Sequence, residues 1–265
     1  MKYDFLKDFK QFLNLRFNKN TADRYYYAVD KVFKDIQFNS IEEIDVDFVY
    51  AELNKTRTKN DFSAVKNGLK QFQKLYPTFG LPPETYFKSE SAKRKNHRKK
   101  VKSPLFADEI NHKINGLHND KFKLAYRLML KSGLRVSETA ALCKSDIEID
   151  GGEIKINVRH GKGGSNGVVT CMPDKYLAKR LERIKSHKGG GDGLFYSAET
   201  MKHKAVEMGI ECHDLRRVAA ITHRNRNIKN VGVYKANGEV KDFLRHKRFS
   251  TTKRYLFNKK LFLHK

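Results

Sequence analysis

Between Tyr3 and Leu75, apolar residues recur with the spacing of amphipathic helices. The clearest helix faces consist of Phe5, Phe9 and Phe12; of Tyr25, Val29, Val32 and Phe33; and of Phe62, Val65, Leu69 and Phe72. We expect Asn20 or Thr21 to cap the second helix, and Asp45 or Asp47 to cap a short helix after it. The pattern predicts a small helical bundle.

From about residue 105 the pattern changes to helices around a β-hairpin. Helical spacing covers 107–117, 121–130, a stretch from Ser137, a stretch from Pro173 to Ile184, residues 212–224 and a last helix that contains Tyr255. Ile154, Ile156 and Val158 alternate with polar residues, as do Val168, Thr170 and Met172 after a glycine-rich turn. Residues 230–242 are poorly periodic, so for 227–246 we expect a loop that leads into a short helix and leaves room for an extra hairpin. The fold class is mainly α with a small antiparallel sheet.

The net charge of the chain restricts the kinds of molecule that it can bind. Lysine and arginine number 55 against 30 acidic residues, a net charge of +25. A polyanion relieves the self-repulsion of such an excess. Apolar runs are too short to span a bilayer and the N-terminus does not resemble a signal peptide, which favours nucleic acid over a membrane. The three separated cysteines indicate neither a disulfide framework nor a zinc site, and fit a cytoplasmic protein.

A basic joint separates the two blocks. Seven of the ten residues from Lys93 to Lys102 are lysine or arginine. Such a run cannot fold alone and is a solvated linker, which we also interpret as a strap across a phosphate backbone. The predicted DNA-binding residues are Lys93, Arg94, Lys95, Arg98, Lys99 and Lys100 in this strap, with Arg24, Arg57 and Lys59 on the helical block. The predicted domains are 1–87, a linker 88–104, and 105–265.

Six residues carry candidate chemistry, and none is decisive alone. Arg135 in its turn could hold a phosphate or simply pair with Glu138. Lys162 sits on a glycine-rich hairpin tip, where most lysines are only solvated. His213 and Arg216 share one face of an otherwise apolar helix. His246 precedes Tyr255 by nine residues, and Tyr255, set among cations, is either a core residue or a phenol that faces a phosphate.

Together these residues resemble the tyrosine recombinase (phage integrase) family, and more narrowly its Xer-like site-specific recombinases. The resemblance rests on "SGLRVSE", "HDLRR" and "LRHKRFSTTKRYL", with a glycine-flanked lysine between two strands. It implies an N-terminal helical core-binding (SAM-like) domain and an α+β catalytic domain of the DNA breaking–rejoining type.

The resemblance also implies the roles of the six residues. Tyr255 is the nucleophile that forms a 3′-phosphotyrosyl bond, and Arg135 and Arg216 hold the non-bridging oxygens. His246 donates a further hydrogen bond, His213 is the general base and Lys162 protonates the leaving 5′ oxygen. No cofactor or metal is expected.

Further expectations follow from the same resemblance. The partner is double-stranded DNA with specific recombination sites, bound by a homotetramer of two dimers, with a monomer in solution and a cytoplasmic, nucleoid-associated location. Arg245 departs from the glycine usual before the second histidine. The short apolar tail after Tyr255 docks either in cis or in trans. Two other functions stay open: a type IB-like relaxing topoisomerase, and an inactive DNA-binding regulator.

Overall fold

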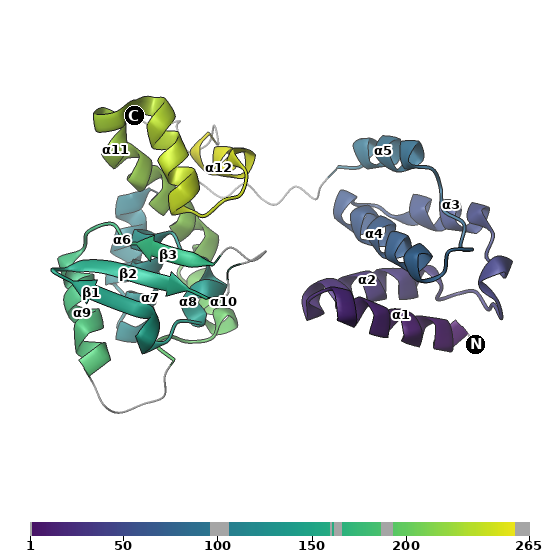
Figure 1. Ribbon diagram of the computed structural model, residues 1–265, viewed down its shortest axis with the longest axis horizontal. Coiled ribbons are helices and arrows are strands. Elements are labelled where there is room, and N and C mark those ends of the chain that lie inside the picture. Colours follow the sequence, from purple (N-terminus) through teal and green to yellow (C-terminus); the bar gives the residue numbers. More distant parts are fainter. Residues whose placement is uncertain (1, 96–105, 160, 162–165, 187–192, 258–265) are drawn as a thin grey trace. The chain divides into compact units, whose positions relative to one another are not determined.

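The computed structural model describes residues 2–95, 106–159, 161, 166–186 and 193–257. The chain divides into two compact units, 1–102 and 103–265, which are described separately (Figure 1). The division falls inside the predicted linker. The first residues of that linker, 88–93, are nevertheless helical, because α5 extends from Glu84 to Lys93. Among the residues described, no helix is both long and apolar enough to cross a membrane.

Unit 1 is the predicted helical bundle. Its elements are α1 (Lys2–Arg16), α2 (Lys19–Val32), the 3₁₀ turn η1 (Ile41–Glu43), α3 (Val46–Lys55), α4 (Lys59–Leu75) and α5. Asp45 caps α3, as expected. The cap of α2 is Asn18 and not Asn20 or Thr21, because the Asn18 side-chain oxygen accepts a hydrogen bond from the Thr21 amide. Phe33 is fully buried, with the rings of Phe38, Phe48, Phe72 and Phe79 around it.

Close packing of α2 on α4 requires a glycine in α4. A Cβ atom on Gly68 would lie 2.8 Å from Val29 Cγ2 and 2.9 Å from the Tyr25 carbonyl oxygen. Any larger residue would therefore separate the two helices or force Val29 to move.

Unit 2 places helices around a three-stranded sheet (Figure 1). Its helices are α6 (Ala107–Asn115), α7 (Asp120–Ser132), α8 (Val136–Ala140), η2 (Lys144–Asp146), α9 (Lys175–Ser186), α10 (Ala198–Glu207), α11 (Cys212–Phe243) and α12 (Phe249–Leu256). The strands β1 (Ile147–Asp150), β2 (Glu153–Val158) and β3 (Gly167–Thr170) pair antiparallel in the order β1-β2-β3. Sequence periodicity did not reveal the short strand β1.

The second strand of the hairpin has the opposite phase to our prediction. Ile156 pairs with Val169, and Val169 is buried while Val168 is 65% exposed. Because side chains alternate along a strand, a shift of one residue turns every side chain to the other face. The run 168–172 contains apolar residues in both phases, so alternation alone does not decide between Val168, Thr170 and Met172 and the opposite phase.

The segment 227–246, predicted as a loop that leads into a short helix, is helical from its start to Phe243. The helix α11 runs to Phe243 and is kinked at Gly232, whose φ of 77° and ψ of 165° are not helical. Side chains bond across the kink: Arg224 Nε donates to Asn237 Oδ1 (2.8 Å) and Asn227 donates to Glu239 (2.8 Å). These polar pairs replace the apolar periodicity that sequence analysis looks for, so the second half of the helix was missed, and no extra hairpin forms in it.

Candidate active site

Arg135 lies at a tight junction between α7 and α8. The chain turns at Gly133, which has a φ of 64° and where a Cβ atom would lie 2.8 Å from the Phe243 ring. Arg135 is the N-cap residue of α8. The helix begins at Val136, one residue before the start predicted at Ser137. The glycine thus lets the helix junction approach the end of α11.

Glu138 holds Arg135 through two contacts. Its Oε2 accepts the Arg135 amide (2.8 Å) and its Oε1 accepts Arg135 Nη1 (2.6 Å). Burial alone would raise the pKa of Glu138, but the Arg135 amide and the guanidinium groups of Arg245 and Arg135 lower it overall. The structural pair considered from the sequence is therefore present, and the Arg135 side chain remains 23% exposed.

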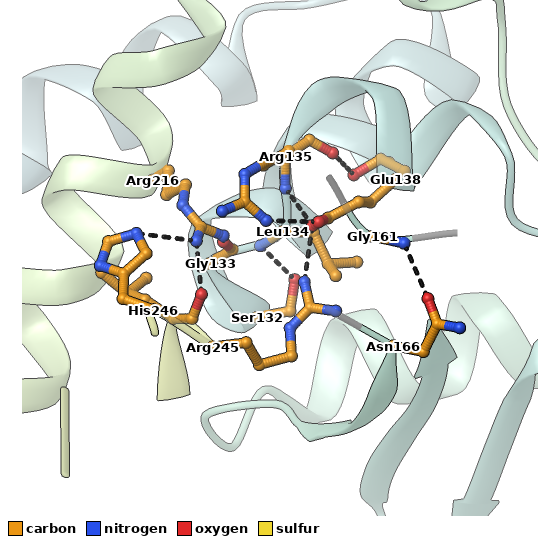
Figure 2. A network of polar contacts seen from close by, with 12 residues as sticks. Ser132, Gly133, Leu134, Arg135, Glu138, Gly161, Asn166, Arg216, Arg245 and His246 are labelled. Carbon is orange, nitrogen blue, oxygen red and sulfur yellow. Dashed lines mark hydrogen bonds and ion pairs between the residues drawn. The ribbon is translucent and has the colours of Figure 1, made fainter. Parts of the chain in front are cut away.

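Arg216 is almost completely buried, at 1% exposure. Its Nη1 donates to the Gly133 carbonyl oxygen (Figure 2), and its Nη2 donates to the Leu244 carbonyl oxygen (2.6 Å). Its Nε is buried and has no hydrogen-bond partner among the described residues. Burial, followed by the charge of Arg135, lowers the pKa of Arg216 to about 10, so the guanidinium stays charged at neutral pH.

His246 is also buried and lies against Arg216. The Nε2 atom is 3.3 Å from Arg216 Nη2, and Nδ1 is 3.0 Å from Thr252 Oγ1. A guanidinium group can only donate, so Nε2 is the acceptor and the imidazole proton resides on Nδ1. Burial and the neighbouring charge of Arg216 lower the pKa of His246 to about 4, which keeps the ring neutral.

Tyr255 meets the first histidine of the motif within the same chain. Its hydroxyl lies 2.8 Å from His213 Nε2, and its ring centroid lies 5.2 Å from that of His213 and 5.3 Å from that of His246. Partial desolvation, then Arg217 and Arg216, lower the pKa of His213 below its usual value. The neutral imidazole of His213 therefore faces the Tyr255 phenol of the same chain.

The structure thus brings together five of the six residues predicted as catalytic. The sixth, Lys162, lies outside the described residues; the nearest described neighbours on its hairpin are Gly161 and Asn166, joined by a hydrogen bond of 3.1 Å (Figure 2). Sequence analysis missed Thr252, which orients His246. Its signal is the spacing of three residues before Tyr255, which places both on one face of α12.

The predicted DNA-binding residues have different surroundings. Arg98, Lys99 and Lys100 lie outside the described residues. Exposed positions are occupied by Arg24, Arg57, Lys93 and Lys95, whereas Lys59 is half-buried. Arg24 also donates to the Asn60 carbonyl oxygen (3.1 Å) and Lys93 pairs with Glu90 (2.6 Å).

Arg94 does not have the open position expected of a strap residue. Its side chain is 8% exposed and donates to the carbonyl oxygens of Leu53 and Thr56, both at 3.0 Å. It also pairs with Glu90 (2.6 Å) and stacks on Phe62 (4.2 Å). The guanidinium donates hydrogen bonds to carbonyl oxygens at the C-terminal end of α3. A run of basic residues in the sequence does not reveal this role.

Known proteins are similar to this chain in sequence and in fold. The phage integrase family model matches residues 106–260. The tyrosine recombinase XerA of Pyrococcus horikoshii is 26% identical over 273 residues, covering 95% of this chain and 88% of the relative. XerA of Saccharolobus solfataricus is 28% identical over 167 residues, covering 61% and 54%.

Solved structures show a similar fold. A lambda integrase dimer bound to a COC′ core site aligns with 97% of this chain and 77% of its own, with a TM-score of 0.66 at 18% identity. XerH bound to a palindromic difH substrate aligns with 89% and 74%, with a TM-score of 0.60 at 14% identity. Because the family match covers more than half of the chain and spans Arg135 to Tyr255, the protein belongs to the phage integrase family, that of the tyrosine recombinases.

Proposed function

We propose that this protein is a site-specific DNA recombinase that cleaves and rejoins DNA through a 3′-phosphotyrosyl bond to Tyr255. The observation that carries the proposal is the 2.8 Å contact of the Tyr255 hydroxyl with His213 Nε2, beside the buried Arg216. The names of the XerA relatives support recombination rather than relaxation alone.

Charge stabilisation falls to the arginines. A phosphodiester repels a nucleophile, and its non-bridging oxygens gain charge in the transition state. Arg216 has no carboxylate in ion-pair contact among the described residues, so its charge is available to those oxygens. Arg135 shares Glu138 with Arg245 and would bind from the exposed side.

The first proton moves from Tyr255 to His213. A phenol in water ionises only near pH 10, so attack at neutral pH needs a base. His213 is neutral because its pKa is lowered, and its Nε2 already faces the hydroxyl. As the Tyr255 oxygen bonds to phosphorus, the bond from phosphorus to the 5′ oxygen breaks. Lys162 would protonate that oxygen.

His246 needs a change before it can donate. Its Nε2 accepts from Arg216 in the structure. A bound phosphate would compete for Arg216 and favour the imidazolium by its negative charge, and the protonated Nε2 could then donate to an oxygen. In the reverse direction the 5′-hydroxyl of a new partner strand attacks the phosphotyrosine, so the bond energy is conserved without a cofactor.

The assembly on DNA follows from the exchange of strands between two sites. Lambda integrase is known as a dimer on a core site and as a tetramer on a Holliday junction. We infer that this protein acts as two dimers on two sites, is a monomer in solution, and resides in the cytoplasm with the nucleoid. Residues 1–87 would form the core-binding domain and 88–104 the strap.

Covalent capture tests the proposal. The protein is incubated with a random-sequence library of duplexes and denatured, and the DNA that remains attached is sequenced; this yields the selected duplex used below. Tyr255→Phe should abolish the adduct and keep DNA affinity, whereas Tyr234→Phe, at a residue 95% exposed, should capture normally. An adduct with Tyr255→Phe would refute the assignment.

A further inference from the structure

Arg245 occupies a backbone position that favours glycine. Its φ is 54°, and among the described residues it alone is a non-glycine residue with positive φ. The Arg245 amide bonds to the Asp242 carbonyl oxygen (2.8 Å) and the His246 amide to the Lys241 carbonyl oxygen (2.9 Å). This is the left-handed turn that ends a helix, here α11, and glycine is its usual residue. An arginine there is strained.

The side chain of Arg245 supplies a reason for accepting that strain. It is 11% exposed, and its Nη2 donates to Glu138 Oε2 at 2.6 Å. The same carboxylate holds the amide and guanidinium of Arg135. Figure 2 shows the two arginines on opposite sides of Glu138. Arg245 therefore ties the N-terminus of α8 to the end of α11.

The two backbone neighbours of Arg245 both reach Arg216. The Leu244 carbonyl oxygen accepts Arg216 Nη2 at 2.6 Å, and His246 Nε2 lies 3.3 Å from the same nitrogen. A change in the direction of the turn at Arg245 would move both contacts. Residue 245 is thus joined through its backbone to one phosphate-binding arginine and through its side chain to the other.

Electrostatics adds a second effect. With Arg245 present, one carboxylate serves two guanidinium groups, so the cluster of Arg135, Glu138 and Arg245 carries a net positive charge. Without Arg245, Glu138 would neutralise Arg135 alone and reduce its attraction for a phosphate oxygen.

We propose that Arg245 is a positioning residue of the active site, which acts through Glu138 to fix and charge Arg135 against Arg216. The proposal rests on the proposed function. It assigns to Arg245 no contact with the reacting phosphate.

The glycine variant provides a clean test, because glycine suits the backbone at φ 54°. Arg245→Gly should fold, as urea unfolding will check, and bind the selected duplex with a Kd within about twofold of the unmodified protein. Its single-turnover cleavage should be slower by about tenfold or more, within the roughly 100-fold loss that a 1 Å misplacement can cause. Arg245→Lys keeps the charge and should recover part of the rate.

A double-mutant cycle separates positioning from direct contact. Glu138→Gln should slow cleavage by itself, and Arg245→Gly should add little to it. Arg180→Ala, which removes another arginine–carboxylate pair of unit 2, that with Asp120, should cleave normally. Independent losses in the cycle, a loss of affinity alone, or full cleavage by Arg245→Gly or by a folded Arg245→Asn, would overturn the inference.

The result for the unmodified protein distinguishes failure of the proposed function from failure of this inference. If the unmodified protein captures no DNA, the proposed function fails and this inference fails with it. If the unmodified protein cleaves and the cycle shows independent losses, the inference alone fails.

Discussion

Arg94 in unit 1 and Arg216 in unit 2 both have side chains that are largely buried and that bind main-chain carbonyl oxygens at helix ends. Arg94 binds those of Leu53 and Thr56, and Arg216 those of Gly133 and Leu244. They differ in their carboxylates. Arg94 pairs with Glu90, whereas no carboxylate within the described chain forms an ion pair with Arg216.

The difference separates an arginine that serves the fold from one that we propose to act in catalysis. A buried charge without a counter-ion is costly to the fold, and two carbonyl oxygens compensate it only partly. The remaining charge of Arg216 is what an incoming phosphate can neutralise. Burial and hydrogen bonding alone would not have separated the two residues.

The largest expected effect is on catalysis at Arg216. Arg216→Lys keeps the charge but loses the planar fork, so single-turnover cleavage of the selected duplex should fall by about a thousandfold or more. The same substitution at Arg94 should lower the rate per folded molecule by less than about tenfold, because the residue serves only the local fold. Similar losses at both positions would remove the distinction.

Substitution of Arg94, unlike that of Arg216, should affect the stability of the fold more than the rate of cleavage. Arg94→Met leaves the carbonyl oxygens of α3 without donors, so the free energy of local opening of unit 1 should fall by about 2–4 kcal/mol. Lys93→Met is the matched control, because Lys93 pairs with the same Glu90 but is exposed, and such pairs contribute little. Hydrogen exchange of the α3 and α4 amides in the full chain measures both. Equal losses of opening free energy for Arg94→Met and Lys93→Met would show that Arg94 contributes no more than an exposed residue.

Desolvation of His213, with the charges of Arg217 and then Arg216, should also set the pH profile of cleavage. Because the pKa of His213 is lowered, its base form persists below pH 6.5 and is lost only as the pH falls through the lowered value. At subsaturating DNA the cleavage rate, corrected for the Kd at each pH, should drop about tenfold per pH unit below that inflection.

Arg217 provides the control for this profile. After desolvation, it contributes most to the lowering of the His213 pKa, so Arg217→Gln should move the inflection upward. An inflection at or above 6.5 in the unmodified protein would contradict the account.

The smallest effect concerns the strap. Replacing Lys93, Lys95, Arg98, Lys99 and Lys100 by glutamine should flatten the plot of log K against log salt by about 0.9 for each phosphate that is no longer neutralised. Adding Arg94→Gln should flatten it no further, because that guanidinium is already bound within unit 1. Further flattening on the sixth change would show that Arg94 reaches DNA.

Sequence analysis succeeded where a residue type and its spacing determine the outcome. The helical bundle, the hairpin strand from Ile154 to Val158, and the gathering of Arg216, His246 and Tyr255 follow from periodicity and motif. It failed where partners distant in sequence decide. The register of β3, the continuation of α11 beyond Gly232 and the side-chain contacts of Arg94 depend on pairs that no local pattern contains.

The central claim is that Tyr255, poised on His213, carries the DNA. Its most direct test is digestion of the trapped adduct, followed by mass spectrometry of the modified peptide and labelling of the released strand. The account predicts a nucleotide attached by its 3′-phosphate to Tyr255 and a 5′-hydroxyl end that a polynucleotide kinase can phosphorylate without prior phosphatase. A nucleotide on any other residue, or a 5′-phosphate on the released strand, would contradict it.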